Sequence, residues 1–231
     1  RQTIVLVEGE QETSGKLPRR YWLIWFALMF GVAIEFCTIY WSADFNAKVL
    51  GLAQNAATQA TSLFLVGMIL GRFAGSRLLE RLPARKILLG SIALGATGYL
   101  AFWSAAHTAL SLAGLFIMGL GVANFYPTLL PLAIRSAGSQ KQLAGARATL
   151  ATGVAIFFLP FGLGSLADLL GIQRAFLIVG LLFVLVVAML AIAVRLPLAR
   201  ASSLQAISRL MPVGSELTSD GNDPAGSGLG E

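Results

Sequence analysis

The chain has 231 residues, of which 56% are hydrophobic and 12% are charged, and it carries a net charge of +6 with a mean hydropathy of +0.76. This composition leaves too little polar surface for a water-soluble globule, so it excludes a cytosolic domain. Of the 17 Lys and Arg and 11 Asp and Glu, 16 lie between Arg20 and Arg195 and 12 lie in the two flanks. The middle of the chain therefore has the composition of a membrane domain.

Six apolar runs are each long enough to cross the hydrocarbon core of a bilayer, which needs about 20 residues per helix. They predict membrane-spanning helices over residues 21–42, 55–79, 84–106, 109–135, 143–167 and 174–196. The runs do not alternate with a period of two, which argues against a β-barrel. We expect an all-α membrane protein with a cytoplasmic linker over 1–18, a six-helix transmembrane domain over 19–198, and a disordered cytoplasmic tail over 199–231.

The connections between the runs predict the orientation in the membrane. The polar residues Asp44, Asn46 and Asp168 fall in the outer connections, together with Lys48 and Arg174. Apart from Arg72 inside a span, the remaining 14 of the 17 Lys and Arg lie on the other side or in the flanks. The positive-inside rule then predicts a protein of the inner cell membrane with both ends in the cytoplasm. The basic charge follows from this topology, so we expect the lipid bilayer as a partner and no nucleic acid.

The first predicted span carries a polar stripe. Gly31, Glu35, Thr38 and Ser42 follow one another at helical spacing and share one face. An acidic residue at mid-membrane costs about 3 kcal/mol on insertion scales, so it faces the bundle interior or a water-filled cavity. Glu35 is either a structural hydrogen-bonding residue or a protonatable site that binds substrate or a coupling proton, with Thr38 beside it. Cys37, the single cysteine, is expected to pack inside this span.

The fourth predicted span has a second polar stripe with Asn124 and Thr128, and Tyr126 lies nearby. Pro127 and Pro131 each remove a backbone donor, so the helix is expected to bend or loosen here. A broken helix at mid-membrane depth can bind solutes. The three polar residues are candidate substrate contacts, and the alternative is a kinked packing helix whose polar groups are satisfied.

The second predicted span has glycines at 67, 71 and 75, a spacing that lets another helix approach closely. Arg72 lies in its cytoplasmic half, where the depth counted along the helix makes it a poor partner for Glu35. A gating role and a simple snorkelling anchor are both open for it. The third and sixth spans have few polar side chains and are expected to contact lipid, while Pro160 predicts a bend in the fifth.

Three segments resemble the major facilitator superfamily of secondary transporters. The Gly71 to Gly75 segment, followed by Glu80-Arg81 and Arg85-Lys86, is similar to the cytoplasmic Gly-x-x-x-Asp-Arg-x-Gly-Arg-Lys signature of that family. It departs from the signature because Leu79 stands at the acidic position. The run from Gly164 through Asp168 to Gly171 resembles the connection between the last two helices, and the run from 121 to 128 resembles the tenth helix.

The resemblance covers residues 19 to 198 and implies the C-terminal six-helix half of such a transporter. It also implies a gating role for the matching residues, which are Gly71, Arg72, Gly75, Glu80, Arg81, Arg85, Lys86, Gly164, Asp168 and Gly171. The family works by alternating access, in which two halves rock around a midplane site. We expect a proton-coupled carrier of a small solute, with an N-terminal half that either precedes this segment or belongs to a second chain.

Other functions find less support in the sequence. An intramembrane hydrolase needs a base in a span, but the single histidine, His107, falls in a predicted outer connection. No Gly-x-x-x-x-Gly-Lys-Ser/Thr segment is present, so the chain does not itself use ATP. We expect no enzyme activity, no metal and no cofactor. The membrane subunit of a multi-chain pump, a passive channel and a structural bundle remain alternatives.

Overall fold

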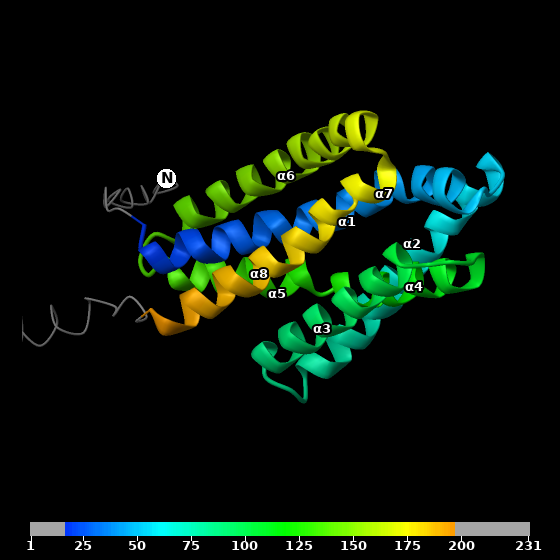
Figure 1. Ribbon diagram of the computed structural model, residues 1–231. Coiled ribbons are helices and arrows are strands. Elements are labelled where there is room, and N and C mark those ends of the chain that lie inside the picture. The colour runs from blue at the N-terminus through cyan, green and yellow to red at the C-terminus, as the bar shows by residue number, and fades with distance from the viewer. Residues whose placement is uncertain (1–16, 197–231) are drawn as a thin grey trace, which may run out of the picture. The chain divides into compact units, whose positions relative to one another are not determined.

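The computed structural model describes residues 17–196, which form eight helices (Figure 1). In chain order they are α1 (Arg19–Leu50), α2 (Gln54–Leu79), α3 (Ala84–Trp103), α4 (Thr108–Val122), α5 (Phe125–Ser136), α6 (Lys141–Leu170), α7 (Ile172–Ala175) and α8 (Leu177–Arg195). They make 6 segments that are long and apolar enough to cross a membrane, with α4 and α5 forming the fourth and α7 and α8 the sixth. The prediction of an all-α fold with six spans is confirmed.

Two predicted segments fall largely outside this region. The linker over 1–18, apart from Leu17 and Pro18, lies outside the described residues, and so does the whole of the tail predicted over 199–231.

The first helix is longer than the sequence predicts. It continues to Leu50, so Asp44 and Asn46 lie in its last turns and their placement in a connection was wrong. The helix ends at Gly51, whose φ of 68° is left-handed and whose N–H donates to the Asn46 carbonyl. The Lys48 ammonium lies 2.7 Å from the Asp44 carboxylate one turn earlier, and this pair allows both charges to remain on the helix.

Asp168 was likewise wrongly placed in a connection. It lies inside α6, which ends two residues later at Leu170. Gly171 follows with a φ of 83°, a backbone conformation that favours glycine, and the chain then turns into α7.

The fourth span is broken near Pro127, as predicted, whereas Pro131 lies inside α5. The α4 helix ends at Val122 and α5 begins at Phe125, so Ala123 and Asn124 separate them. Pro127 lies in the first turn of α5, where its missing N–H costs nothing. A continuous helix would instead place the Pro127 ring against the Ala123 carbonyl, which explains where the break falls.

The helices pack as two groups (Figure 1). In the first group, α5, α6 and α8 all pack on α1, and in the second, α2 and α3 both pack on α4. The broken fourth span therefore contributes α4 to one group and α5 to the other. Contacts between α1 and α2 join the groups. The rings of Phe45 on α1, Phe102 on α3 and Phe176 between α7 and α8 pack against one another in tilted and edge-to-face contacts.

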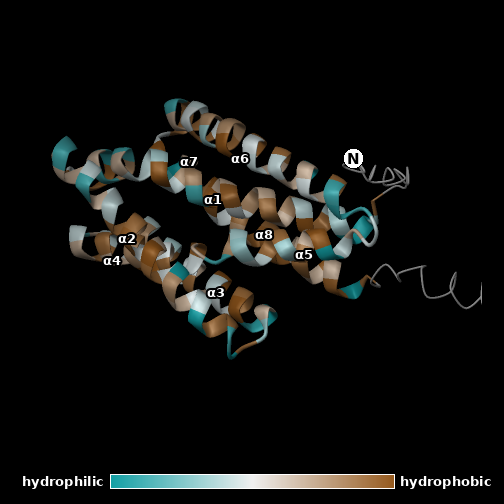
Figure 2. Ribbon diagram, turned by 180° about the vertical axis from the view of Figure 1, so that it is seen from behind, coloured by the Kyte–Doolittle hydropathy of each residue, from teal (hydrophilic) through white to brown (hydrophobic). Residues whose placement is uncertain are grey.

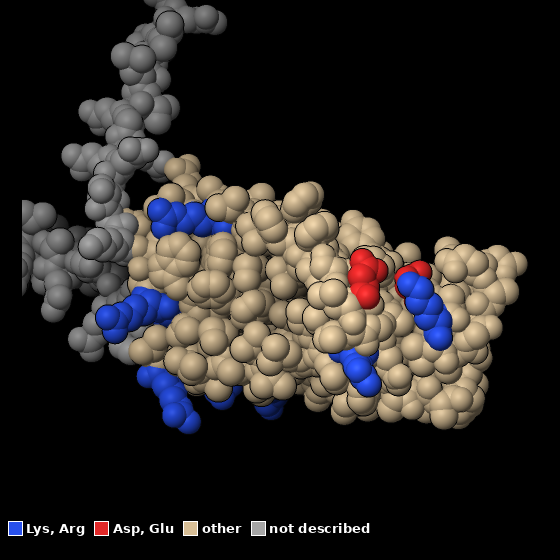
Figure 3. Space-filling view, turned by 45° about the horizontal axis from the view of Figure 1, so that its top comes forward, with Lys and Arg blue, Asp and Glu red and all other residues tan. Residues whose placement is uncertain are grey.

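Apolar residues run along the helices and polar residues gather at their ends (Figure 2). Most of the Lys and Arg side chains on the face seen in Figure 3 lie toward one end, and the acidic side chains lie toward the opposite end together with other basic ones. In the most hydrophobic stretch of α2, of α6 and of the sixth span, 28% of the residues are buried, against 56% in α1. The third and sixth spans were predicted to contact lipid. The apolar surfaces of α2 and α6 are as exposed as that of the sixth span, so the exposed apolar surface extends beyond the two predicted spans.

Candidate functional site

Glu35 and Arg72 form an ion pair between the two helix groups. The Arg72 Nη2 lies 3.6 Å from the Glu35 Oε1, a distance for charge attraction that is too long for a hydrogen bond. Glu35 lies near the middle of α1, about 24 Å from its first residue and about 22 Å from its last. Its side chain is 14% exposed and that of Arg72 is 56% exposed, so the pair reaches the surface of the bundle on the Arg72 side.

This pairing corrects the expectation that Arg72 lies too deep to meet Glu35. The expectation counted depth from a first helix ending at Ser42, whereas α1 ends at Leu50. Glu35 is then 15 residues from the end of α1 and Arg72 is 18 residues from the start of α2 at Gln54. Since only residues 51–53 connect the two helices, the depths differ by about 4.5 Å, which an arginine side chain spans easily.

The polar stripe beyond Glu35 faces the second helix group. Thr38 is fully buried, and its hydroxyl donates to the Ile34 carbonyl at 2.7 Å. The hydroxyls of Ser42 and Thr61 of α2 share a hydrogen bond of 2.8 Å, and the Ser111 hydroxyl of α4 donates to the Asn46 Oδ1 at 2.6 Å. The sequence placed Thr38 and Ser42 on one stripe with Glu35, and the structure shows that this side of α1 bonds to α2 through Ser42 and to α4 through Asn46.

Asn124 turns toward α2 from the break between α4 and α5. Its Nδ2 donates to the Gly71 carbonyl at 3.2 Å, and its side chain is 7% exposed. A Cβ at Gly75 would collide with the Asn124 carboxamide. The Gly71 to Gly75 spacing, which indicated close helix packing, thus forms a slot for one amide side chain.

Tyr126 and Thr128 complete the predicted contacts on this span. Tyr126 is half-buried against the core, and Thr128 is 7% exposed. The Thr128 hydroxyl has no hydrogen-bond partner within residues 17–196. Neither residue is linked by a hydrogen bond to Glu35 in that part of the chain, so the structure unites Glu35 with Arg72, and Asn124 with α2, as separate contacts.

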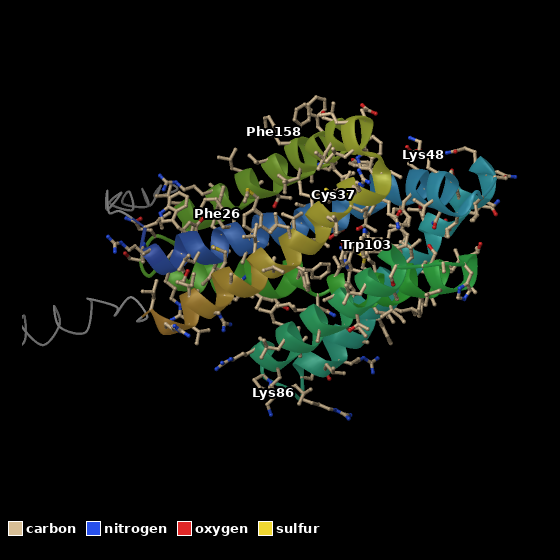
Figure 4. The ribbon with its side chains drawn as sticks, viewed as in Figure 1. Phe26, Cys37, Lys48, Lys86, Trp103 and Phe158 are labelled. Atoms are coloured by element: carbon tan, nitrogen blue, oxygen red, sulfur yellow. The ribbon has the colours of Figure 1, made fainter. Side chains whose placement is uncertain are left out.

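Four charged residues of the predicted signature surround the connection between α2 and α3. They are Glu80, Arg81, Arg85 and Lys86, all exposed, and Figure 4 shows Lys86 at this edge of the bundle. Among the described residues none of them forms an ion pair within 4 Å. Arg77, which the sequence did not single out, lies with its guanidinium 5.1 Å from the centre of the Phe73 ring.

Gly164 accommodates a tryptophan of α1. A Cβ there would collide with the Trp41 ring, whose Nε1 donates to the Pro160 carbonyl at 2.9 Å. The two helices also line an open groove of about 340 Å³, formed by Tyr40, Trp41, Ile156, Phe157, Pro160 and Phe161. Sequence reasoning missed Trp41, because an apolar run gives no signal for one indole N–H that has a distant carbonyl partner.

Comparisons with known proteins agree with the all-α membrane fold. The family profile of the Major Facilitator Superfamily matches residues 21–212. An uncharacterized MFS-type transporter of Yersinia pestis is 30% identical over 148 residues, which cover 64% of this chain and 38% of the relative. A protein of Brucella abortus named as a glucose/galactose transporter is 30% identical over 144 residues, which cover 57% of this chain and 32% of that relative.

Two solved transporter structures share the fold. FucP, a Major Facilitator Superfamily transporter in the outward conformation, superposes with a TM-score of 0.68 at 19% identity, covering 76% of this chain and 42% of FucP. PepTSo2 superposes with a TM-score of 0.60 at 14% identity, covering 82% of this chain and 46% of PepTSo2. The chain spans less than two-fifths of the length of the curated relatives described above.

Proposed function

The chain belongs to the Major Facilitator Superfamily of membrane transporters, and from this premise we propose that it forms the C-terminal half of a proton-coupled carrier. The carrier moves a small solute by alternating access, without changing it chemically. The N-terminal half is proposed to cover the open faces of α2 and α6, whose most hydrophobic windows are only 28% buried. The basic end of the bundle is proposed to face the cytoplasm from the inner membrane.

The Glu35–Arg72 ion pair carries the proposal. A guanidinium that is 56% exposed beside the middle of a membrane-spanning helix is costly against lipid, so this face of α1 and α2 is better suited to a water-filled cavity. The pair holds while Glu35 is ionised. Protonation of Glu35 removes its charge and releases Arg72, which gives one proton a means of changing the contact between the two helix groups.

The substrate class is proposed from the relatives. The Brucella abortus relative is named as a glucose/galactose transporter, and we propose a hexose or a sugar of similar size for this chain. Glu35 offers an acceptor and Arg72 offers donors for sugar hydroxyls at the same place. Binding there would compete with the ion pair and so link sugar binding to proton binding.

The proposal is tested by uptake of labelled glucose and galactose into proteoliposomes that contain the full-length transporter. With an imposed pH gradient the wild type accumulates sugar, and E35Q loses this accumulation while still exchanging sugar across the membrane. The reason is that glutamine keeps the shape of the side chain but cannot bind and release the proton.

The matched control is D44N, which removes a carboxylate from the same helix about 13.5 Å from Glu35. This variant should accumulate sugar as the wild type does. Accumulation by E35Q at the wild-type level would contradict proton coupling through Glu35, and no uptake of either hexose by the wild type would contradict the substrate class.

A further inference from the structure

Asn124 occupies the point at which the chain passes from one helix group to the other. Its backbone, with φ of −97° and ψ of 0°, lies in the break between α4 and α5, and its carbonyl accepts the Thr128 N–H at 3.2 Å at the start of α5. Its side chain is directed away from both helices and into α2. A buried amide at a helix break is usually satisfied by neighbouring backbone, and here that backbone belongs to another membrane-spanning helix.

The contact with α2 is specific in shape as well as in hydrogen bonding. The Asn124 Nδ2 donates to the Gly71 carbonyl at 3.2 Å. At Gly75, one turn further, there is no room for a Cβ beside the same carboxamide. The other close approaches between α2 and α4, at Gly67 and Gly119, are to backbone atoms and offer no side-chain hydrogen bond.

The residue after Gly71 is Arg72, the partner of Glu35. We propose that Asn124 is a positioning residue for the ion pair: its hydrogen bond to Gly71 fixes the height of α2 so that Arg72 reaches Glu35. A displacement of α2 by one residue corresponds to about 1.5 Å along the axis. The pair already lies at 3.6 Å, so with the Arg72 rotamer unchanged a shift of that size would carry it beyond the distance of a direct ionic contact. This role rests on the proposed function of Glu35 in proton coupling.

The other charges near α1 do not replace Arg72. Within the described part of the chain, Arg72 is the single basic residue within 4 Å of Glu35. The other charged side chains of the helices that pack on α1 lie toward helix ends, and they are Arg77, Arg135, Lys141, Arg147, Asp168, Arg174 and Arg195. A change in the pH dependence of transport after substitution of Asn124 therefore reports on the Glu35–Arg72 contact.

The first test measures the approach of α1 to α2 without any transport. In the full-length protein with Cys37 replaced by Ala, E35C and R72C are combined and treated with thiosulfonate cross-linkers of graded length. The variant N124L keeps the branched shape of the asparagine side chain and removes its donor. Because the lost hydrogen bond stabilises the contact only modestly, we expect the shortest effective reagent to react about five- to tenfold more slowly in N124L.

The matched control is S111A, which also removes a buried hydrogen bond between helix groups but acts at Asn46, away from Arg72. It should leave the cross-linking rate unchanged. The second variant, N124A, removes the amide without adding bulk and is used where N124L does not fold. Unchanged cross-linking in the folded Asn124 variant, or equal slowing in S111A, would overturn the positioning role.

The second test is the pH profile of sugar uptake, normalised to folded transporter. N124L and N124A should flatten the profile toward that of E35Q, whereas S111A should keep the wild-type profile. A purely structural role for Asn124 would lower the amount of folded protein and leave the normalised profile unchanged, which would contradict the inference. If the wild type shows no pH dependence, the proposed proton coupling fails, while the cross-linking result still decides whether Asn124 positions Arg72.

Discussion

The helices within each of the two groups are held together by a different kind of contact. Between α3 and α4 the backbones nearly touch, because Gly121 lies against the backbone of Gly95. Between α1 and α6 the contacts are made by aromatic donors: the Tyr21 hydroxyl donates to the Ala144 carbonyl at 2.8 Å, and the Trp25 Nε1 donates to the Arg147 carbonyl at 2.7 Å. The glycine contacts form because glycine has no side chain that would keep the two backbones apart. The aromatic contacts form through hydrogen bonds that side chains donate to backbone carbonyls of the neighbouring helix.

This difference gives the two groups different tolerances. A glycine contact between backbones admits no added carbon, so its substitution should separate the helices. The aromatic donors of α1 extend from Tyr21 to Trp41, about 30 Å along the helix, and fix the register of α6 through most of the membrane. Losing one donor leaves the other two, so the α1–α6 contact should weaken by steps.

The largest expected effect is in the glycine-packed group. G121L forces a side chain into the backbone at Gly95 and should lower the free energy of unfolding by about 3 kcal/mol. The control is G90L on α3, where no atom lies within 4 Å of the added Cβ. Thermal unfolding of the detergent-solubilised transporter measures both, and equal melting temperatures would contradict the close approach of α3 and α4.

A smaller effect is expected at the contact between Trp41 of α1 and Gly164 of α6. G164A moves the Trp41 ring and breaks its hydrogen bond to the Pro160 carbonyl, which should cost about 2 kcal/mol. The control G162A, two residues earlier on the same helix, adds the same methyl group in open space and should cost little. If both variants melted at the same temperature, the contact between Trp41 and Gly164 would not stabilise α1 against α6.

The smallest effect is expected at the hydrogen bond between Ser42 of α1 and Thr61 of α2, which links the two helix groups. S42A or T61A alone leaves a buried hydroxyl without its partner and should cost about 1 kcal/mol. The double variant removes both hydroxyls, so its cost should be less than the sum of the two single costs. A double-mutant cycle in thermal unfolding measures this coupling, and additive costs would contradict a hydrogen bond between α1 and α2.

The sequence predicts much of the fold and part of the site. The spans followed from hydropathy, and the break near Pro127 followed from the chemistry of proline. Glu35 could be singled out because a carboxylate in an apolar run is expensive. Its partner Arg72 was missed because the first helix was predicted to end at Ser42, before the polar residues that begin with Asp44. The helix continues to Leu50 because Lys48 pairs with Asp44, and hydropathy does not reveal such a pair.

The site residues on the fourth span show a different limit. Helical spacing placed Asn124 and Thr128 on one face, which assumed a continuous helix. Since the helix is interrupted at Asn124, its side chain turns toward Gly71 instead, and no local pattern specifies that direction. Their predicted role as substrate contacts stays a prediction, as does that of Thr38 and Tyr126.

The length of 231 residues and the share of 12% charged residues led from the outset to a membrane bundle, because burial in lipid depends on the composition of each span alone. Which helices touch, and through which atoms, was decided by tertiary packing. A glycine at position 75 or an arginine at position 72 acquires its meaning only from the residue that the fold brings opposite to it, Asn124 for one and Glu35 for the other.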